Sequence, residues 1–269
     1  MSGQGRGEIR ALLDRHDVRP VKRLGQHFLA DPNLVDRIVR TAAVGPGDSV
    51  VEIGPGTGSL TLALADTGAR VVAYEVDERL RPLLEETLTG RDVELRWADA
   101  ARLDLSADLG GGRWTMVANL PYNVGSGIVL DALRADGPID RFVVMVQREV
   151  ADRLLASPGS KTYGLPSVIV SLHAAGSVAF SVAASVFVPP PDVDSAVVVL
   201  DRIEAPADAE EAIRLAAAAF GQRRKMLRRS LASELVDAEA VLAAAGVDPT
   251  ARAEDLQPTD FVAIAQVAA

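Results

Sequence analysis

The sequence predicts an α/β protein in which a mostly parallel sheet, covered by helices on both faces, precedes a small helical domain. Three observations predict this fold class. Continuous apolar runs alternate with amphipathic helical patterns between residues 49 and 157, as in sheets whose strands are buried on both faces. A glycine-rich turn, from Gly54 to Gly58, follows the first of these runs. Beyond residue 205 the chain is rich in alanine and leucine with helical periodicity.

The elements can be assigned in order along the chain. The first predicted helix follows Asp31, a suitable N-cap, with Pro32 at its first helical position, and it ends near Gly45. Apolar strands are then expected at 49–53, 70–76, 93–98, 114–120 and 141–147. Helices are expected between them, at about 59–67, 77–88, 126–134 and 148–157.

The pattern changes after residue 157. Two β-like runs, 176–188 and 195–200, flank three consecutive prolines, and we expect them to form an antiparallel pair that closes one edge of the sheet. We place the domain boundary in the segment that follows. Residues 1–205 are therefore expected to form the α/β domain, and residues 206–269 the helical domain.

Composition excludes several classes of protein. The 269 residues are 48% hydrophobic and 24% charged, which is ordinary for a globular protein. The absence of cysteine excludes disulfides, iron–sulfur clusters and cysteine nucleophiles. The three histidines lack a metal-binding spacing, so we expect no metal site. The N-terminus lacks the apolar core of a signal peptide, and the longest stretch without charge, 162–191, contains four prolines. We expect a soluble, cytoplasmic protein that does not associate with a membrane.

The distribution of charge is more informative than its total of −9. Residues 1–30 carry a net charge of +3 and residues 220–230 carry +5, so the remaining 228 residues sum to −17. A positive face on an acidic body is compatible with nucleic acid, because the field of each cluster is local and screened within about 10 Å. The alternative is a solvated basic helix without a partner.

The glycine-rich turn and two acids predict a nucleoside site. The glycines of the turn have a G-x-G-x-G spacing, which differs from the G-x-G-x-x-G of a dinucleotide pyrophosphate loop. Glu75 ends the second predicted strand, where a carboxylate can accept hydrogen bonds from both hydroxyls of an adenosyl ribose. Asp99 follows the third strand and can reach the adenine. A plain tight turn with two surface acids is the alternative, and the three features in series favour the nucleoside site.

The fourth predicted strand ends in Asn119, Leu120, Pro121 and Tyr122. An asparagine oxygen and a neighbouring backbone carbonyl can accept both N–H bonds of an exocyclic amine. Proline fixes the turn, and the tyrosine ring offers a face on which a base can stack. The segment could be only a strand-ending turn, but its position beside the predicted nucleoside pocket makes it the candidate for catalysis.

Taken in order, these motifs resemble those of the ribosomal RNA adenine N6,N6-dimethyltransferases, and most closely the KsgA/RsmA branch. The resemblance rests on GQHFL (25–29), VEIGPGTGSLT (51–61), Glu75, Asp99, NLPY (119–122) and FVPPPDVDSA (187–196), with 147–168 and 219–231 also similar. It implies a Rossmann-like sheet of the class I S-adenosylmethionine-dependent methyltransferases. It also implies methyl transfer from S-adenosylmethionine to N6 of two adjacent adenosines near the 3′ end of 16S rRNA, in a precursor of the small ribosomal subunit.

The resemblance also implies roles for individual residues. Contacts with S-adenosylmethionine carry over to Gln26, His27, Leu29, Gly54, Gly56, Glu75, Val76, Asp99, Ala100 and Asn119. His27 is a departure, because some relatives have asparagine there, so its contact could be through the backbone or absent. Asn119 and the carbonyl of Leu120 or Pro121 would hold the adenine amine in line with the sulfonium methyl. Tyr122 and Phe187 would sandwich the flipped base, although Phe187 also fits a half-buried strand of the core.

The basic segments then acquire a role in binding RNA phosphates, which positions the RNA rather than specifying it. We expect a helix over 223–229 that presents arginines to RNA and buries Met226 and Leu227, and we expect a monomer. The predicted phosphate-binding residues are Arg19, Lys22, Arg23, Arg223, Arg224, Lys225, Arg228 and Arg229.

Three alternative functions remain to be compared with this one: a methyltransferase with another RNA substrate, a protein without catalytic activity and an enzyme of another class. A methyltransferase of the macrolide-resistance type, acting on 23S rRNA, shares the catalytic motifs, but segments 147–168 and 219–231 favour the small-subunit branch. A ribosome-assembly factor without turnover would not need the intact glycine turn, Glu75, Asp99 and Asn119. A dehydrogenase using nicotinamide cofactors is excluded by the spacing of the glycines.

Overall fold

The structure, a computed structural model, describes residues 3–135 and 137–268 and divides into two compact units. The first unit comprises Met1–Ala151 and Ser177–Asp201, and the second comprises Asp152–Gly176 and Arg202–Ala269. This division differs from the expected one, because a segment from the middle of the chain joins the C-terminal residues. The reason is that helix α8 (Leu165–His173) packs on helices α9 (Ala209–Gly221) and α12 (Pro258–Ala268).

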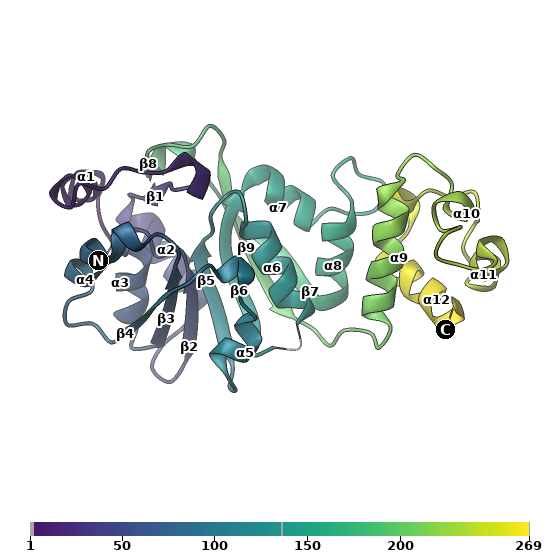
Figure 1. The fold of residues 1–269 in the computed structure, drawn as a ribbon, viewed down its shortest axis with the longest axis horizontal. Helices are drawn as coiled ribbons and strands as arrows, with labels where there is room; N and C mark the ends of the chain where they lie inside the picture. The colour runs from purple at the N-terminus through teal and green to yellow at the C-terminus, as the bar shows by residue number, and fades with distance from the viewer. Residues whose placement is uncertain (1–2, 136, 269) are drawn as a thin grey trace. The chain divides into compact units, whose positions relative to one another are not determined.

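A seven-stranded sheet with the order β4-β3-β2-β5-β6-β9-β7 organises the first unit (Figure 1). The strands from β4 to β6 pair in parallel, and β9 pairs antiparallel with β6. This arrangement confirms the predicted α/β fold class. The strands are β2 (Ser49–Ile53), β3 (Arg70–Glu75), β4 (Val93–Trp97), β5 (Trp114–Asn119), β6 (Ile139–Gln147), β7 (Ala174–Val182) and β9 (Ser195–Arg202).

Helices cover the sheet of the first unit. Helix α2 (Pro32–Ala42) begins as predicted, because the Asp31 carboxylate accepts hydrogen bonds from the first N–H groups of the helix. It packs with α3 (Ser59–Ala65) behind the sheet, whereas α6 (Gly125–Arg134) lies in front of it (Figure 1). The first unit also contains α4 (Arg81–Thr87) and α5 (Leu105–Leu109), and α7 (Arg148–Leu154) begins in it.

An N-terminal helix, α1 (Arg6–Arg15), precedes the elements that the sequence analysis assigned. Its apolar side chains Ile9, Leu12 and Leu13 are buried in one cluster with leucines of α4. The expected strand 176–188 is in fact two strands, because β7 ends at residue 182 and a short β8 (Phe187–Val188) leaves the large sheet. Strand β8 pairs instead with β1 (Phe28–Leu29), which joins the N-terminal segment to the segment before the prolines.

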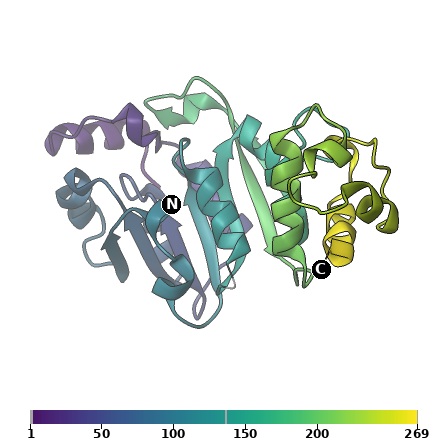
Figure 2. The ribbon, with the colours of Figure 1, turned by 45° about the vertical axis from the view of Figure 1, so that its right-hand side comes forward.

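The second unit is helical, as predicted (Figure 2). Besides α8, α9 and α12 it contains α10 (Leu227–Ser230) and α11 (Ala238–Ala244). An aromatic cluster holds it together. The Tyr163 ring meets Phe220 edge to face at 5.6 Å between centroids, and its hydroxyl donates to the Leu256 carbonyl at 2.9 Å.

The prediction of one basic helix over 223–229 is wrong. Helix α9 ends at Gly221, residues 222–225 form turns, and Met226 is extended with φ −64° and ψ 148°. Leu227 is fully buried as expected, but Met226 is exposed. Arg224 and Arg228 therefore do not share the face of one helix. Within the part of the chain that the structure describes, no helix is both long enough and apolar enough to cross a bilayer.

Candidate functional site

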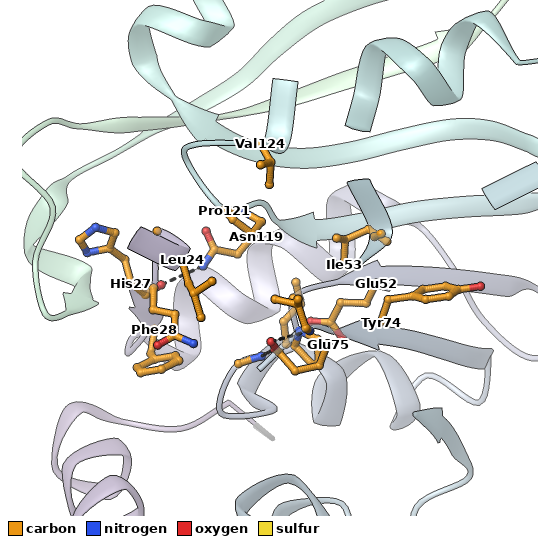
Figure 3. A pocket seen from close by; sticks show the side chains of 18 of the residues that line it. Leu24, His27, Phe28, Glu52, Ile53, Tyr74, Glu75, Asn119, Pro121 and Val124 are labelled. Carbon is orange, nitrogen blue, oxygen red and sulfur yellow. Dashed lines mark hydrogen bonds between the residues drawn. The ribbon is translucent and has the colours of Figure 1, made fainter. Parts of the chain in front are cut away.

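A pocket of about 800 Å³, part of it open to solvent, lies at the carboxyl ends of β2, β3 and β5 (Figure 3). This edge is where parallel α/β sheets bind ligands. All ten residues that the resemblance assigns to the cofactor line it: Gln26, His27, Leu29, Gly54, Gly56, Glu75, Val76, Asp99, Ala100 and Asn119. Pro121 also lines it, whereas Leu120, Tyr122 and Phe187 do not.

The glycine turn forms the floor between β2 and α3. Gly54 and Gly56 have φ of +72° and +60°, a region that favours glycine. A Cβ atom at Gly56 would lie 2.9 Å from Cδ1 of the Phe28 ring, which is too close for a real contact. Glycine is therefore needed at position 56 both for its backbone conformation and for the space it leaves.

Glu75 is a buried carboxylate that organises this end of the sheet. It is 5% exposed and accepts hydrogen bonds from the backbone N–H groups of Gly56 at 3.2 Å, Val76 at 3.0 Å and Asp77 at 2.9 Å. Burial raises the pKa of Glu75, and the N–H donors of Asp77 and Gly56 oppose that rise. The side chain thus connects the end of β3 to the glycine turn.

Glu52 is a pocket residue that the sequence analysis missed. It is 1% exposed, and its Oε2 atom has no hydrogen-bond partner among the described residues. Burial raises the pKa of Glu52 to about 8, and the nearby Glu75 contributes to that rise. The signal was an acid inside the apolar run 49–53, because glutamate is rarely fully buried without a partner.

Gln26 and Asp99 have protein partners in addition to their place in the pocket wall. Gln26 accepts from the backbone N–H of Val21 at 2.9 Å and donates to the Asp77 carboxylate at 2.8 Å. Asp99 accepts from the backbone N–H of Ala101 at 3.1 Å. Gln26 therefore fixes the N-terminal segment against the end of β3, a link between residues 51 positions apart.

Asn119 ends β5 with one satisfied and one unsatisfied polar atom. Its Nδ2 donates to the backbone carbonyl of His27 at 3.0 Å, whereas the buried Oδ1 has no partner among the described residues. The carbonyl of Pro121 accepts from the N–H of Gly125 at 2.8 Å and so begins α6. The Asn119 oxygen is thus a buried acceptor with unused capacity, which favours an N–H donor as its ligand.

The two predicted stacking rings have different environments. The Tyr122 ring stacks on the His27 ring at 5.2 Å, and its hydroxyl lies 2.5 Å from Oγ of Ser195. Burial raises the pKa of Tyr122. Phe187 is fully buried in the core with residues of α2 and α3. No face of the Phe187 ring is exposed in this structure, so the ring is part of the core here, and its stacking on a base stays a prediction.

The predicted phosphate-binding residues of the second unit divide into paired and unpaired side chains. Arg223 pairs with Glu254 at 2.7 Å and also donates to the Lys161 carbonyl. Arg228 lies 3.6 Å from Glu239. Among the described residues, Arg224 and Arg229 have no acidic partner and are exposed. Lys225, Arg228 and Arg229 line one open groove beside α10 and α11.

In the first unit, Arg19 lies 3.0 Å from Asp14, and both side chains are exposed. Lys22 and Arg23 are exposed in a turn of 3₁₀ helix, Lys22–Leu24. Residues 3–135 and 137–268 include no group of three or more histidine and acidic side chains arranged to hold a metal ion.

Comparisons with known proteins agree on one family. The model of the family described as ribosomal RNA adenine dimethylase matches residues 19–269. The chain is 48% identical to ribosomal RNA small subunit methyltransferase A of Kineococcus radiotolerans, covering 96% of this chain and 89% of that protein. It is 46% identical to the protein of the same name from Streptomyces avermitilis, covering 97% and 92%.

Solved structures show the same fold. A dimethyladenosine transferase from Plasmodium falciparum matches with a TM-score of 0.76 and 24% identity, covering 88% of this chain and 96% of that one. The 23S rRNA methyltransferase ErmE matches with a TM-score of 0.67 and 28% identity, covering 90% and 99%. The alternative of a 23S-type enzyme is not favoured, because the curated relatives with 42–48% identity are named for the small subunit.

Proposed function

Because this chain belongs to the ribosomal RNA adenine dimethylase family, we propose that it transfers methyl groups from S-adenosylmethionine to N6 of two adjacent adenosines near the 3′ end of 16S rRNA. The observation that carries the proposal is the unpartnered Oδ1 of Asn119 in the same pocket wall as Glu75 and the glycine turn. Asn119 Oδ1, which can accept a hydrogen bond from an amine, therefore lies beside the predicted nucleoside site.

The chemistry of the pocket wall suits an adenosyl cofactor. Glu75 would accept hydrogen bonds from the ribose hydroxyls, and Asp99 would contact the adenine. The two buried acids Glu52 and Glu75 line the pocket, and a cationic ligand beside them would oppose the rise in pKa that burial causes and so favour their charged forms. When bound, S-adenosylmethionine supplies the electrophilic methyl group.

The reaction needs the adenine amine to be held rather than strongly deprotonated. The lone pair of N6 is delocalised into the ring, so the nitrogen becomes nucleophilic as it pyramidalises. Asn119 Oδ1 would accept one N–H, and this favours the developing positive charge on nitrogen. The carbonyl of Leu120 is the favoured second acceptor, because the carbonyl of Pro121 already accepts from Gly125. The Tyr122 ring would hold the flipped base in place.

The basic side chains would position the RNA through its phosphates. In the second unit we assign this role to the residues that are free of acidic partners, Arg224 and Arg229, together with Lys225. In the first unit we assign it to the exposed Lys22 and Arg23. Arg223 is left out, because its guanidinium is already held by Glu254.

The proposal is tested by methyl transfer to purified ribosomal subunits from a strain that lacks this modification. Tritiated methyl groups are expected in the RNA of the small subunit and not in that of the large subunit. Label in 23S rRNA alone would identify the macrolide-resistance type instead. Cofactor binding without transfer to either subunit would support a non-catalytic assembly factor.

A further inference from the structure

We infer that His27 is a positioning residue for the adenine substrate and not a side-chain ligand of the cofactor. Its ring contacts both the Tyr122 ring and the backbone of Pro189, and so holds them in place. The inference rests on the proposed function, since it assigns a role within the same site.

The ring of His27 is held by two neighbours. It stacks on the Tyr122 ring with 5.2 Å between centroids and 29° between planes. Its Nδ1 lies 2.8 Å from the carbonyl oxygen of Pro189. Because a carbonyl only accepts, Nδ1 carries the hydrogen in this contact. The ring points away from Glu52 and Glu75 on the far side of the pocket (Figure 3).

The backbone around His27 is attached to the same strand-end segment. The His27 carbonyl accepts from Asn119 Nδ2 at 3.0 Å, and the Arg23 carbonyl accepts from Asn123 Nδ2 at 3.0 Å. A Cβ atom at Gly25 would lie 3.0 Å from the backbone nitrogen of Tyr122. The N-terminal segment therefore contacts residues 119–123 closely along its length, with His27 beside both the amine acceptor and the stacking ring.

Tyr122 is consequently fixed at two points. Its hydroxyl meets Ser195 Oγ at 2.5 Å, and one face of its ring is covered by His27. A base that stacks on Tyr122 must use the face that His27 leaves. Because catalysis depends on holding the reacting nitrogen within a fraction of an ångström, a loosened ring lowers turnover without changing the cofactor pocket.

The test compares His27→Ala, which removes both ring contacts, with His27→Phe, which retains a ring and loses the contact with Pro189. His16→Ala is the matched control, because His16 is a histidine of the same unit that contacts Glu86 instead. Calorimetry gives the Kd for S-adenosylmethionine, and steady-state assays at saturating cofactor give kcat and KM for small subunits.

We expect all three variants to bind S-adenosylmethionine within twofold of the unmodified protein. His27→Ala should lower kcat/KM for the subunit by roughly threefold to tenfold, the range of one aromatic pair, and His27→Phe should recover part of this loss. A weaker cofactor Kd in His27→Ala, with unchanged kcat at saturating cofactor, would overturn the inference in favour of a cofactor ligand.

A second readout does not depend on activity. Of the three tyrosines, Tyr74 and Tyr163 are at most 1% exposed, so Tyr122 is the one available for nitration by tetranitromethane. Peptide mass spectrometry identifies the nitrated residue. Tyr122 should be nitrated faster in His27→Ala than in His27→Phe or His16→Ala. Equal rates would overturn the inference. If the unmodified protein methylates neither subunit, the proposed function fails and the role in positioning adenine fails with it, whereas nitration still tests whether His27 fixes the Tyr122 ring.

Discussion

The Glu75 carboxylate accepts a hydrogen bond from the backbone N–H of Gly56 at 3.2 Å, so the end of β3 holds the glycine turn that follows β2. The same carboxylate also accepts from Val76 and Asp77. The residue proposed to bind the ribose therefore also shapes the turn beside it. Both contributions are lost together when Glu75 is truncated.

Glu75→Ala is expected to weaken binding of S-adenosylmethionine by about 1–3 kcal/mol, because the ribose hydroxyls lose a charged acceptor. Glu75→Gln keeps the shape and an acceptor oxygen, so it should lose less. Isothermal titration calorimetry measures both. An unchanged affinity in Glu75→Ala would remove Glu75 from the ribose site.

Glu52 should make stability depend on pH. Because its pKa is raised to about 8 in the folded protein, the folded state retains a proton that the unfolded state has lost, and stability declines as the pH rises from about 5 towards 8. Glu52→Gln cannot ionise, so its Tm should exceed that of the unmodified protein at pH 8. The difference should shrink towards pH 5. Thermal melts across this range test the effect, and a Tm difference that is constant with pH would contradict it.

Asn119→Ala should lower turnover by roughly 10²–10³-fold, the usual effect of removing one acceptor or donor aimed at a developing charge. RNA binding should persist, because the amide acts on the reacting amine. Single-turnover assays and subunit pelleting separate the two properties. If a folded Asn119→Ala protein loses affinity for cofactor and RNA in parallel, Asn119 is a general pocket residue.

The basic residues of the second unit should separate by their partners. Replacing Arg224 and Arg229 with glutamate should weaken small-subunit binding and reduce its salt dependence, with little change in Tm. Arg223→Ala should instead lower the Tm modestly, because it breaks the contact with Glu254. Pelleting over a salt series and thermal melts on both variants test this division. Unchanged pelleting in the double variant would remove these arginines from the RNA site.

The sheet could be predicted from the sequence because its parallel strands are continuous apolar runs, and β2 has the bounds that the run 49–53 predicted. The pocket wall could also be predicted, since glycines and acids at strand ends converge at one edge of a parallel sheet. The start of α2 could be predicted from Asp31, because N-capping is an interaction between residues close in sequence.

Other features depend on contacts between distant residues and could not be predicted in this way. The link of Gln26 to Asp77 and the stack of His27 on Tyr122 require the folded chain. A family motif identified Phe187 but not its burial, which follows from the pairing of β8 with β1. The prediction of a basic helix over 223–229 was wrong because turns and the extended Met226 separate α9 from the short α10, and the spacing of the arginines does not reveal this break.

The central claim is that two adjacent adenosines of 16S rRNA each receive two methyl groups on N6. The most direct measurement is mass spectrometry of nuclease fragments from the 3′ end of 16S rRNA, after small subunits from an unmodified strain have reacted with this protein and S-adenosylmethionine. The account predicts one fragment that contains two adjacent N6,N6-dimethyladenosines. This fragment should be absent when the Asn119→Ala variant is used in place of the wild-type protein. Unmodified adenosines in that fragment, with methylated adenosine in 23S rRNA instead, would contradict it.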